Sequence, residues 1–379
     1  MLSSNYHYVI VGGGMAGLQL ALSFSKDLFF QGKTIAIIDP DPQHKQSKTW
    51  CFWEKGIGNW DEIVYKEWEK GIFASGTVEK PLEIFPYKYK MVRSVDFYSY
   101  ARETLEETGD FYFIEDSIND IDPVRMKAFG QKGEYTASHF FDSRIPSEFF
   151  KDTKYSKIKQ HFKGWLIETQ NPHFDPDIFT MMDFRSKYKN STSFTYCLPV
   201  SPTKALIEFT FFTPYLTDEN VYDEYLEKYV SDILKIADFE ILETEKGEIP
   251  MTDFPFYLES TPKITKIGTG GSWVKGSTGY SFKNTEKKIE ILIENIKAGR
   301  IPSQDLINKM FQKYDAIFLD VLSEKNEIGE ATFSKLYSKN SPQEIFKFLD
   351  EETEISEELK IMFTLFHPQF VKSFFRKIF

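Results

Sequence analysis

The most constraining feature of the sequence is a glycine-rich turn between a short apolar strand and a helix. The strand is His7–Val11, the turn is Gly12-Gly13-Gly14-Met15-Ala16-Gly17, and residues 18–24 continue at helical spacing. In a dinucleotide-binding unit the first glycine allows a tight turn, the second lets a pyrophosphate approach the backbone, and the third lets helix and strand pack closely. The pattern predicts that Gly12, Gly14 and Gly17 hold a diphosphate at a helix N-terminus.

A second apolar strand, residues 33–38, follows the helix and ends at Asp39. An acid at this position is placed to accept hydrogen bonds from a ribose diol. The alternative is a glycine-rich loop in an ordinary α/β protein, but strand, helix, second strand and terminal acid are all in register. The apolar stretch Tyr8–Phe24 is not expected to be a signal peptide or a membrane span, because a run of three glycines, with a fourth at Gly17, interrupts it and no basic residue precedes it.

A second glycine cluster favours FAD over NAD, which the first motif alone cannot do. Ile264–Phe282 begins like a strand, passes through glycines and small residues, and leads into a helical stretch from Asn284. This resembles the second flavin contact of FAD enzymes, where backbone N–H groups meet the flavin and its ribityl chain; a flexible surface loop is the alternative. We predict FAD as the cofactor, with this second set of contacts: Gly268, Gly271, Thr278, Gly279 and Tyr280.

Two further cofactor contacts are predicted from their position in the chain. Residues 134–144 read as a strand that closes on Asp142, and strand ends are where α/β proteins place ligand contacts. Such a segment is also a common turn. Arg93 is placed like the basic residue that flavoproteins of this kind aim at the cofactor, and a surface salt bridge to Asp96 is the alternative.

Several strings together point to one family. They are Thr49-Trp-Cys-Phe-Trp53, Tyr89–Tyr98, Leu198–Thr210 and Gly247-Glu-Ile-Pro-Met251. With the glycine motifs they resemble, in order from about residue 7 to about residue 285, the bacterial lycopene β-cyclases of carotenoid synthesis. The resemblance implies a flavoprotein fold of the hydroxylase and geranylgeranyl-reductase type, reduced FAD with NAD(P)H as electron donor, and lycopene or a related linear carotenoid, dissolved in a membrane, as substrate.

Glu208 matches the glutamate assigned to acid–base catalysis in this family. An acidic residue often follows that glutamate, whereas here Phe209 does. Alternation along the strand places Glu208 on the face opposite Phe209 and Phe211. A carboxyl group buried without a cationic partner has a raised pKa and can stay protonated near neutral pH. We predict that Glu208 protonates the terminal double bond of a linear polyene, so that its ψ-ends close to β-ionone rings, via γ-carotene to β-carotene.

A carbocation needs a dry pocket lined by aromatic faces. The chain has 37 Phe, 20 Tyr and 6 Trp, more rings than packing alone usually needs. The alternatives are that these rings are ordinary core residues, and that Glu208 is an acid exposed on an edge strand or paired with a base such as Lys204 or Arg185. We predict a substrate pocket built from the aromatic residues of the two motifs: Trp50, Phe52, Trp53, Phe209 and Phe211.

Charge and cysteine content exclude several classes of function. The formal net charge of −11 argues against nucleic-acid binding. Cys51 and Cys197 are too few for a disulfide framework and lack zinc-site spacing, so we expect no metal and a cytoplasmic location. The last thirteen residues, 367–379, hold three bases, no acid and four phenylalanines. This composition favours peripheral contact with anionic lipid, and a docked terminal helix is the alternative.

The predicted fold class is α/β (α+β), with a Rossmann-like FAD-binding domain interleaved with a mixed-sheet substrate domain. The expected boundaries are 1–80, 100–160 and 262–300 for the first, 81–99 and 161–261 for the second, and 301–379 for a C-terminal helical region. Ser341-Pro-Gln-Glu344 is typical of a capped helix start. The alternative functions are an FAD-dependent monooxygenase or prenyl reductase of the same fold, and a carotenoid- or lipid-binding flavoprotein without turnover.

Overall fold

The computed structural model describes residues 2–42 and 48–378, which form two compact units. Each unit is assembled from three stretches of chain. Unit 1 is Met1–Gln46, Ser94–Tyr155 and Phe254–Lys309, and unit 2 is Ser47–Arg93, Ser156–Asp253 and Met310–Phe379. The predicted boundaries are corrected. Residues 48–80, 156–160 and 310–378 belong to unit 2, whereas residues 94–99 and 254–261 belong to unit 1. The predicted class, a Rossmann-like unit interleaved with a mixed-sheet unit, is confirmed.

Unit 1 is built on a sheet whose central strands are parallel. Among the described residues its order is β8-β2-β1-β11-β10-β9, with β17 paired to β11. The strands around β1 pair in parallel, and β9 and β10 add an antiparallel edge. Such central strands are buried on both faces, which explains the unbroken apolar run at residues 35–38. The strands are β1 (Leu2–Val11), β2 (Ile35–Asp39), β8 (Phe111–Glu115), β9 (Ile118–Asp122), β10 (Lys127–Gly130), β11 (Gly133–Asp142) and β17 (Ile264–Lys266).

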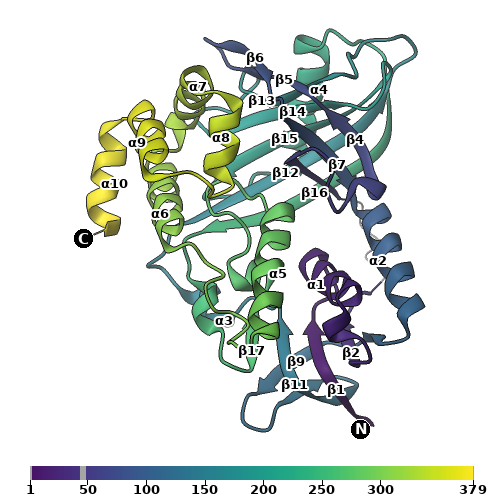
Figure 1. Ribbon diagram of the computed structural model, residues 1–379. Helices are drawn as coiled ribbons and strands as arrows, with labels where there is room; N and C mark the ends of the chain where they lie inside the picture. Colours follow the sequence, from purple (N-terminus) through teal and green to yellow (C-terminus); the bar gives the residue numbers. More distant parts are fainter. Residues whose placement is uncertain (1, 43–47, 379) are drawn as a thin grey trace. The chain divides into compact units, whose positions relative to one another are not determined.

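Helix α1 begins directly at the glycine turn of unit 1. It packs against both α2 and α5, as Figure 1 shows. Its buried side chains, Leu18 and Leu22 among them, cover the sheet side. The helices of unit 1 are α1 (Met15–Lys26), α2 (Ser94–Thr108), α3 (Ser147–Lys151) and α5 (Phe282–Lys297).

Unit 2 contains a large mixed sheet and a small antiparallel one. Within the described residues the large sheet runs β16-β12-β15-β14-β13-β5-β6 and the small one β3-β7-β4. Its long strands β12, β15 and β16 are antiparallel neighbours. The strands are β3 (Thr49–Lys55), β4 (Val64–Trp68), β5 (Lys70–Ala74), β6 (Glu79–Glu83), β7 (Tyr87–Arg93), β12 (Lys157–Glu168), β13 (Ile178–Asp183), β14 (Ser193–Pro199), β15 (Lys204–Thr213) and β16 (Glu240–Thr252).

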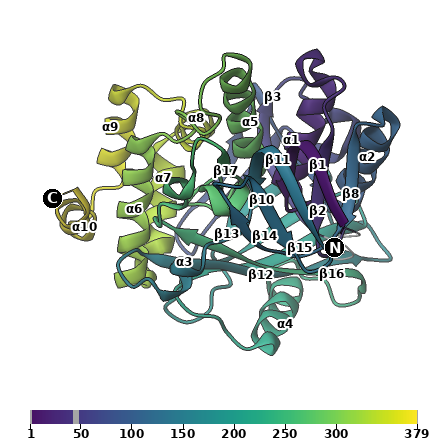
Figure 2. The same ribbon diagram turned by 90° about the horizontal axis from the view of Figure 1, so that it is seen from below.

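Helices cover unit 2 in two places. Helix α4 lies against one face of the β12–β15 pair, below the sheet in Figure 2. The C-terminal helices pack on one another, and α8 begins with the predicted capping box, in which Ser341 and Glu344 each bond the other's backbone. The helices are α4 (Glu219–Lys228), α6 (Lys309–Glu324), α7 (Gly329–Lys339), α8 (Pro342–Leu349), α9 (Ile355–Thr364) and α10 (Pro368–Ile378).

Candidate active site

Two glycines of the first motif are required by the protein's own packing. Gly12 has φ +104°, and a Cβ there would lie 2.0 Å from Ser143 Oγ. A Cβ on Gly17 would lie 2.0 Å from the carbonyl oxygen of Gly12. Both positions therefore demand glycine even without a ligand, as expected for a tight turn that brings helix and strand together.

Gly14 is different, because packing within the protein does not require a glycine at this position. A Cβ on Gly14 would meet no atom within 4 Å, and its φ of −72° suits any residue. Gly14 is also the N-cap of α1 and makes no side-chain capping bond, so the first N–H groups of the helix are open to an anion. A cavity of about 210 Å³ adjoins it. Its lining includes Gly12, Gly14, Gly17, Ser143, Gly268, Thr269, Trp273, Ser281 and Thr285.

A second cavity adjoins the same turn at Asp39. It measures about 240 Å³ and is lined by Gly13, Asp39, Tyr98 and Arg102 among others. One oxygen of Asp39 accepts a hydrogen bond from Gly13 N–H at 2.7 Å. Burial, with the Asp39 charge, raises the pKa of Tyr98 to about 12. An open helix N-terminus, a glycine with free space and an acid at the next strand end together fit a dinucleotide such as FAD.

The second glycine cluster returns to the first, as predicted. β17 extends the sheet beside β11, and Gly268 follows it with φ +57° and its Cβ position 3.1 Å from Ala16 Cβ. Gly271 is explained by packing, because a Cβ there would lie 2.4 Å from the Lys266 carbonyl oxygen. Thr278, Gly279 and Tyr280 form the turn before α5, held by backbone bonds to Lys275. Their contact with a flavin stays a prediction.

Asp142 and Arg93 each have protein partners. Asp142 is 4% exposed, and its oxygens bond Arg144 Nε at 2.8 Å and Lys266 Nζ at 3.0 Å. Burial raises its pKa, but the Arg144 bond and the Lys266 charge hold that pKa below its usual range. Arg93 donates twice to Glu243, at 2.8 and 2.9 Å, so its ion-pair partner is not Asp96. Both cofactor contacts stay predictions, and the geometry explains both residues structurally.

Glu208 lies on β15 and meets a second glutamate that the sequence reasoning missed. Gly164 on β12 pairs with Glu208 on one side and with Glu245 of β16 on the other. Residues in one row across a sheet point to the same face. The two carboxyl groups lie close enough that each affects the pKa of the other. Glu208 therefore has a second carboxyl group beside it, from a strand that is not its neighbour in the sheet.

Each of the two carboxyl groups also accepts a hydroxyl. Thr210 Oγ1 donates to Glu208 Oε1 at 2.7 Å, and Thr49 Oγ1 donates to Glu245 Oε2 at 2.8 Å. Burial, then the charge of Glu245, raises the pKa of Glu208 well above its usual range. Burial also raises the pKa of Glu245 to about 7, against the opposing effect of the Thr49 bond. At least one of the pair is thus protonated near neutral pH.

The expected competitors for Glu208 are engaged elsewhere. Lys204 pairs with Glu168 at 3.3 Å. Arg185 pairs with Asp183 and Glu79. Neither base neutralises Glu208, so the alternative of a simple surface ion pair with one of them is wrong.

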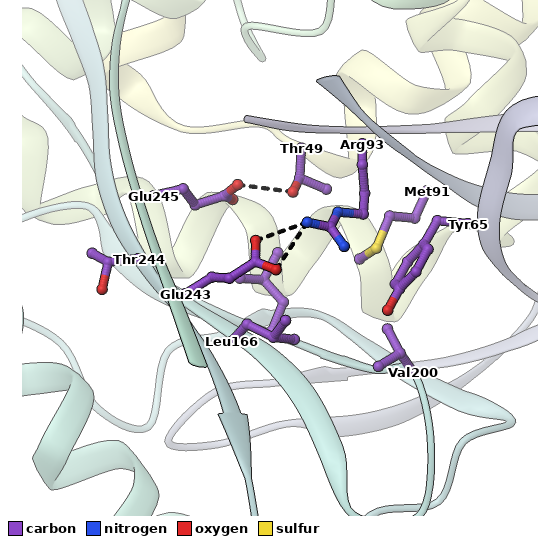
Figure 3. A pocket seen from close by; sticks show the side chains of 10 residues that line it. Thr49, Tyr65, Met91, Arg93, Leu166, Val200, Glu243, Thr244 and Glu245 are labelled. Atoms are coloured by element: carbon purple, nitrogen blue, oxygen red, sulfur yellow. Dashed lines mark hydrogen bonds and ion pairs between the residues drawn. The ribbon is translucent and has the colours of Figure 1, made fainter. Parts of the chain in front are cut away.

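A small cavity adjoins the pair, at Glu245 (Figure 3). Its volume of about 30 Å³ holds about one or two water molecules. The Arg93–Glu243 ion pair and the Thr49–Glu245 bond both line it, as the dashed lines in Figure 3 mark. This cavity is far too small for the ring of a terpenoid substrate.

The predicted aromatic pocket is corrected at two positions. Phe209 stacks on Tyr225 with ring centroids 4.9 Å apart, and Phe211 stacks on His161 at 4.7 Å. Both rings lie in the core beneath α4, on the face of the sheet opposite Glu208. They cannot line a pocket around that carboxyl group, because alternation turns them away from it.

The three aromatic residues of β3 have other surroundings. Trp53 is 6% exposed and stacks on Phe346 of α8 with centroids 4.5 Å apart, and Phe52 is 3% exposed. Trp50 is partly exposed. Cys51, between them, lies close enough to the glutamates that burial, then Glu208 and Glu245, raises its thiol pKa well above the usual range. The cyclase-type string on β3 therefore does border the carboxyl pair, through Thr49 and Cys51.

The fold has many relatives among solved structures. A geranylgeranyl bacteriochlorophyll reductase-like protein from Thermoplasma acidophilum has a TM-score of 0.58 at 12% identity, over 99% of this chain and 100% of its own. The flavin-dependent brominase Bmp2 gives 0.62 at 12%, over 98% and 100%. A tryptophan halogenase from Shewanella frigidimarina gives 0.60 at 10%, over 100% and 94%. At these identities the likeness defines the fold, one used by flavin-dependent enzymes.

The family is defined by the sequence. The model of the lycopene cyclase protein family matches residues 8–375, nearly the whole chain. The protein therefore belongs to the lycopene cyclase family, and the predicted resemblance is confirmed. No curated protein matches the chain in sequence. Every helix within the described residues is too short or too polar to cross a bilayer.

Proposed function

We propose that this protein is a lycopene β-cyclase, which closes the linear ψ-ends of lycopene to β-ionone rings without net redox change. The observation that carries the proposal is the raised pKa of Glu208, which has no ion pair with Lys204 or Arg185. Burial and a neighbouring carboxyl group raise this pKa. Ring closure begins with protonation of an alkene, a weak base, and a carboxyl group that is still protonated near neutral pH is suited to deliver that proton.

The cofactor that fits unit 1 is FAD. Gly12, Gly14 and the N-terminus of α1 would hold its diphosphate, and Asp39 its ribose. When bound and reduced, with NAD(P)H as electron donor, FAD supplies an electron-rich anionic ring that stabilises positive charge electrostatically.

The chain's own chemistry is proton transfer at Glu208. Its proton goes to the terminal double bond, whose electron pair forms the new C–H bond and leaves a tertiary cation. The next double bond supplies the pair for the ring-closing C–C bond. A ring C–H bond then breaks, its electrons form the ring double bond, and the proton returns to the carboxylate. Protons and electrons balance, so γ-carotene and then β-carotene form as isomers of lycopene.

Replacing Glu208 by Gln tests this assignment. We expect ring formation from lycopene with reduced FAD to fall at least ~100-fold, because an amide cannot act as the acid. Bound flavin should be unchanged. Glu168→Gln, which alters a partly exposed glutamate on the neighbouring strand β12, is the matched control and should cyclise normally. Retained ring formation in Glu208→Gln would remove Glu208 from the mechanism.

The same assay separates the rival functions. A monooxygenase or prenyl reductase of this fold would consume one NAD(P)H for each product formed. Cyclisation has no net redox change, so it consumes no NAD(P)H for each ring formed. Many rings per NAD(P)H under anaerobic conditions would support cyclisation. Carotenoid binding without product would support a binding protein instead.

We propose that the protein collects its substrate as a peripheral protein at the cytoplasmic face of a membrane. Helices α9 and α10 each carry an exposed apolar face at helical spacing. We call this set the C-terminal apolar surface: Ile355, Leu359, Phe363, Phe366, Val371, Phe374 and Phe375, which are between 39% and 76% exposed. Side chains of this kind favour insertion into the boundary between headgroups and acyl chains.

A further inference from the structure

The two glutamates Glu208 and Glu245 meet because the residue between them has no side chain. Glu208 and Glu245 lie on strands that are not neighbours, with β12 between them. Gly164 occupies the β12 position in their row. A Cβ at Gly164 would lie 3.1 Å from Glu245 Cγ and 3.5 Å from Glu208 Cβ. Its φ is not positive, so the backbone does not require glycine. The space above Gly164 is therefore shared by the two glutamate side chains and by Leu206, whose Cδ1 would lie 3.2 Å from that Cβ.

One oxygen of this pair lacks a conventional partner. Thr49 and Thr210 each donate to one oxygen of a carboxyl group. Glu245 is 8% exposed, and its Oε1 is buried without a hydrogen bond from any N–H or hydroxyl of the residues that the structure describes. A buried carboxylate oxygen left in this state carries a free-energy cost. A proton carried by the facing carboxyl group removes that cost.

We propose, building on the cyclisation proposed above, that Glu245 is a positioning residue that shares one proton with Glu208 across Gly164. The pair, and not Glu208 alone, is then the acid and the base. It starts with one proton and one negative charge, gives the proton to the terminal double bond, and becomes doubly negative while the substrate is a cation. The C–H bond that breaks after ring closure returns its proton to the pair.

The charges around the pair fit this role. Arg93 and Glu243 face Glu245, but they are bonded to each other and largely cancel. On β3, burial, then the charges of Glu208 and Glu245, raises the pKa of the Cys51 thiol, so this group stays neutral. Two desolvated carboxyl groups this close cannot both ionise readily. The proton is therefore retained at a pH where a single glutamate of ordinary pKa has lost it.

The test uses three single variants of the full-length protein. Glu245→Gln keeps the shape but removes the shared charge. Gly164→Ala inserts a methyl group between the partners. Glu248→Gln, an exposed glutamate of the same strand that pairs with Lys159 on the other face, is the matched control. A double variant that combines Glu245→Gln with Gly164→Ala asks whether the two changes act through one pair, because independent effects add and shared ones do not.

The first readout needs no substrate. In infrared pH titrations, the protonated-carboxyl band that Glu208→Gln removes should persist to alkaline pH in the wild type. It should titrate at least one pH unit lower in Glu245→Gln and in Gly164→Ala, because Glu208 then loses the neighbour that retains its proton. The control should match the wild type, and the double variant should shift no further than Glu245→Gln.

The second readout is the pH profile of ring formation. The pH at which kcat falls on the alkaline side should be at least one pH unit lower in Glu245→Gln than in the wild type. This variant should therefore be at least tenfold slower at pH 8, while its KM and flavin content stay near wild type. Identical titration of Glu245→Gln and wild type in the infrared would overturn the shared proton. A shifted infrared band in a protein that makes no rings would instead support the pair and overturn cyclisation.

Discussion

Glycines that look alike in the sequence have different causes in the structure. Gly17 is glycine because the backbone of Gly12 lies against it, whereas Gly14 faces open space beside the α1 N-terminus. Only the second situation points to a ligand, because the protein itself would accept a side chain there. This contrast separates folding from cofactor binding at single positions.

Replacing Gly14 and Gly17 by Ala should therefore give different results. Gly14→Ala should lower flavin affinity at least tenfold at a stability cost of about 1 kcal/mol or less. Gly17→Ala should lower the unfolding free energy by about 2 kcal/mol or more. Flavin fluorescence and thermal denaturation measure the two effects. Gly76→Ala, where a Cβ meets only Glu330 Oε1 at 3.6 Å, is the control. Normal flavin binding by Gly14→Ala would contradict a diphosphate at this turn.

The sequence predicts local features of the site but not its partners. The glycine turn, Asp39 and the face of Glu208 follow from spacing along one segment. Glu245 does not, because it meets Glu208 through the pairing of three strands, and pairing register depends on contacts distant in sequence. Its signal was nonetheless present: Glu245 stands two residues before Gly247 of a string already recognised as family-like. The opposite orientation of Phe209 was also readable from alternation.

At the scale of single elements, α10 combines features of both predictions for the C-terminal segment, a docked helix and a surface that contacts lipid. The helix is docked, because Ser373 Oγ donates to the Ile317 carbonyl oxygen at 3.1 Å and Arg376 Nε bonds Asp320 at 2.9 Å. Lys377 bonds Asp253 at 2.8 Å. Two of the three bases expected to meet anionic lipid are thus neutralised within unit 2, and what α10 exposes is mainly apolar.

Membrane binding should accordingly depend on the phenylalanines more than on charge. The double change Phe374→Ser and Phe375→Ser should reduce flotation with liposomes several-fold, and binding should respond only weakly to added salt or to anionic lipid. Phe150→Ser, which alters a 72% exposed phenylalanine of unit 1, is the control. Unchanged flotation of the double variant would show that the C-terminal apolar surface does not bind the membrane.

At the scale of the whole molecule, each unit has a buried histidine among the residues that the structure describes. His139 of β11 lies 2.9 Å from Thr265 Oγ1, and His161 of β12 lies 2.8 Å from Thr213 Oγ1. Burial lowers the pKa of each to about 4. Between pH 6.5 and 4 the unfolded chain therefore binds more protons, so stability falls as the pH falls. The raised pKa values of Glu208 and Glu245 act in the opposite sense, because the folded state keeps protons that the unfolded chain releases above about pH 4.5.

His161→Gln should reduce the amount of stability that unit 2 loses as the pH falls. The fall in unfolding free energy from pH 6.5 to 4.5 should be smaller than in the wild type, by up to on the order of 3 kcal/mol, because one proton fewer binds on unfolding. Denaturant titrations at the two pH values measure it. His173→Gln, at an exposed histidine of the same unit, should follow the wild type. If the unfolding free energy falls equally between pH 6.5 and 4.5 in His161→Gln and in the wild type, His161 is not a neutral buried histidine.

The strand that carries Glu245 is also the last of its sheet. Among the described strands, β16 pairs with β12 and ends the order. An end strand offers backbone groups to other chains, and proteins discourage such pairing with charged side chains. Glu240, Lys246 and Glu248 lie along β16, next to Ile241 and Leu242, which are 43% and 37% exposed. The charged residues of β16 are therefore expected to disfavour pairing of this sheet edge with another chain, on the same strand that carries the proposed proton-sharing residue Glu245.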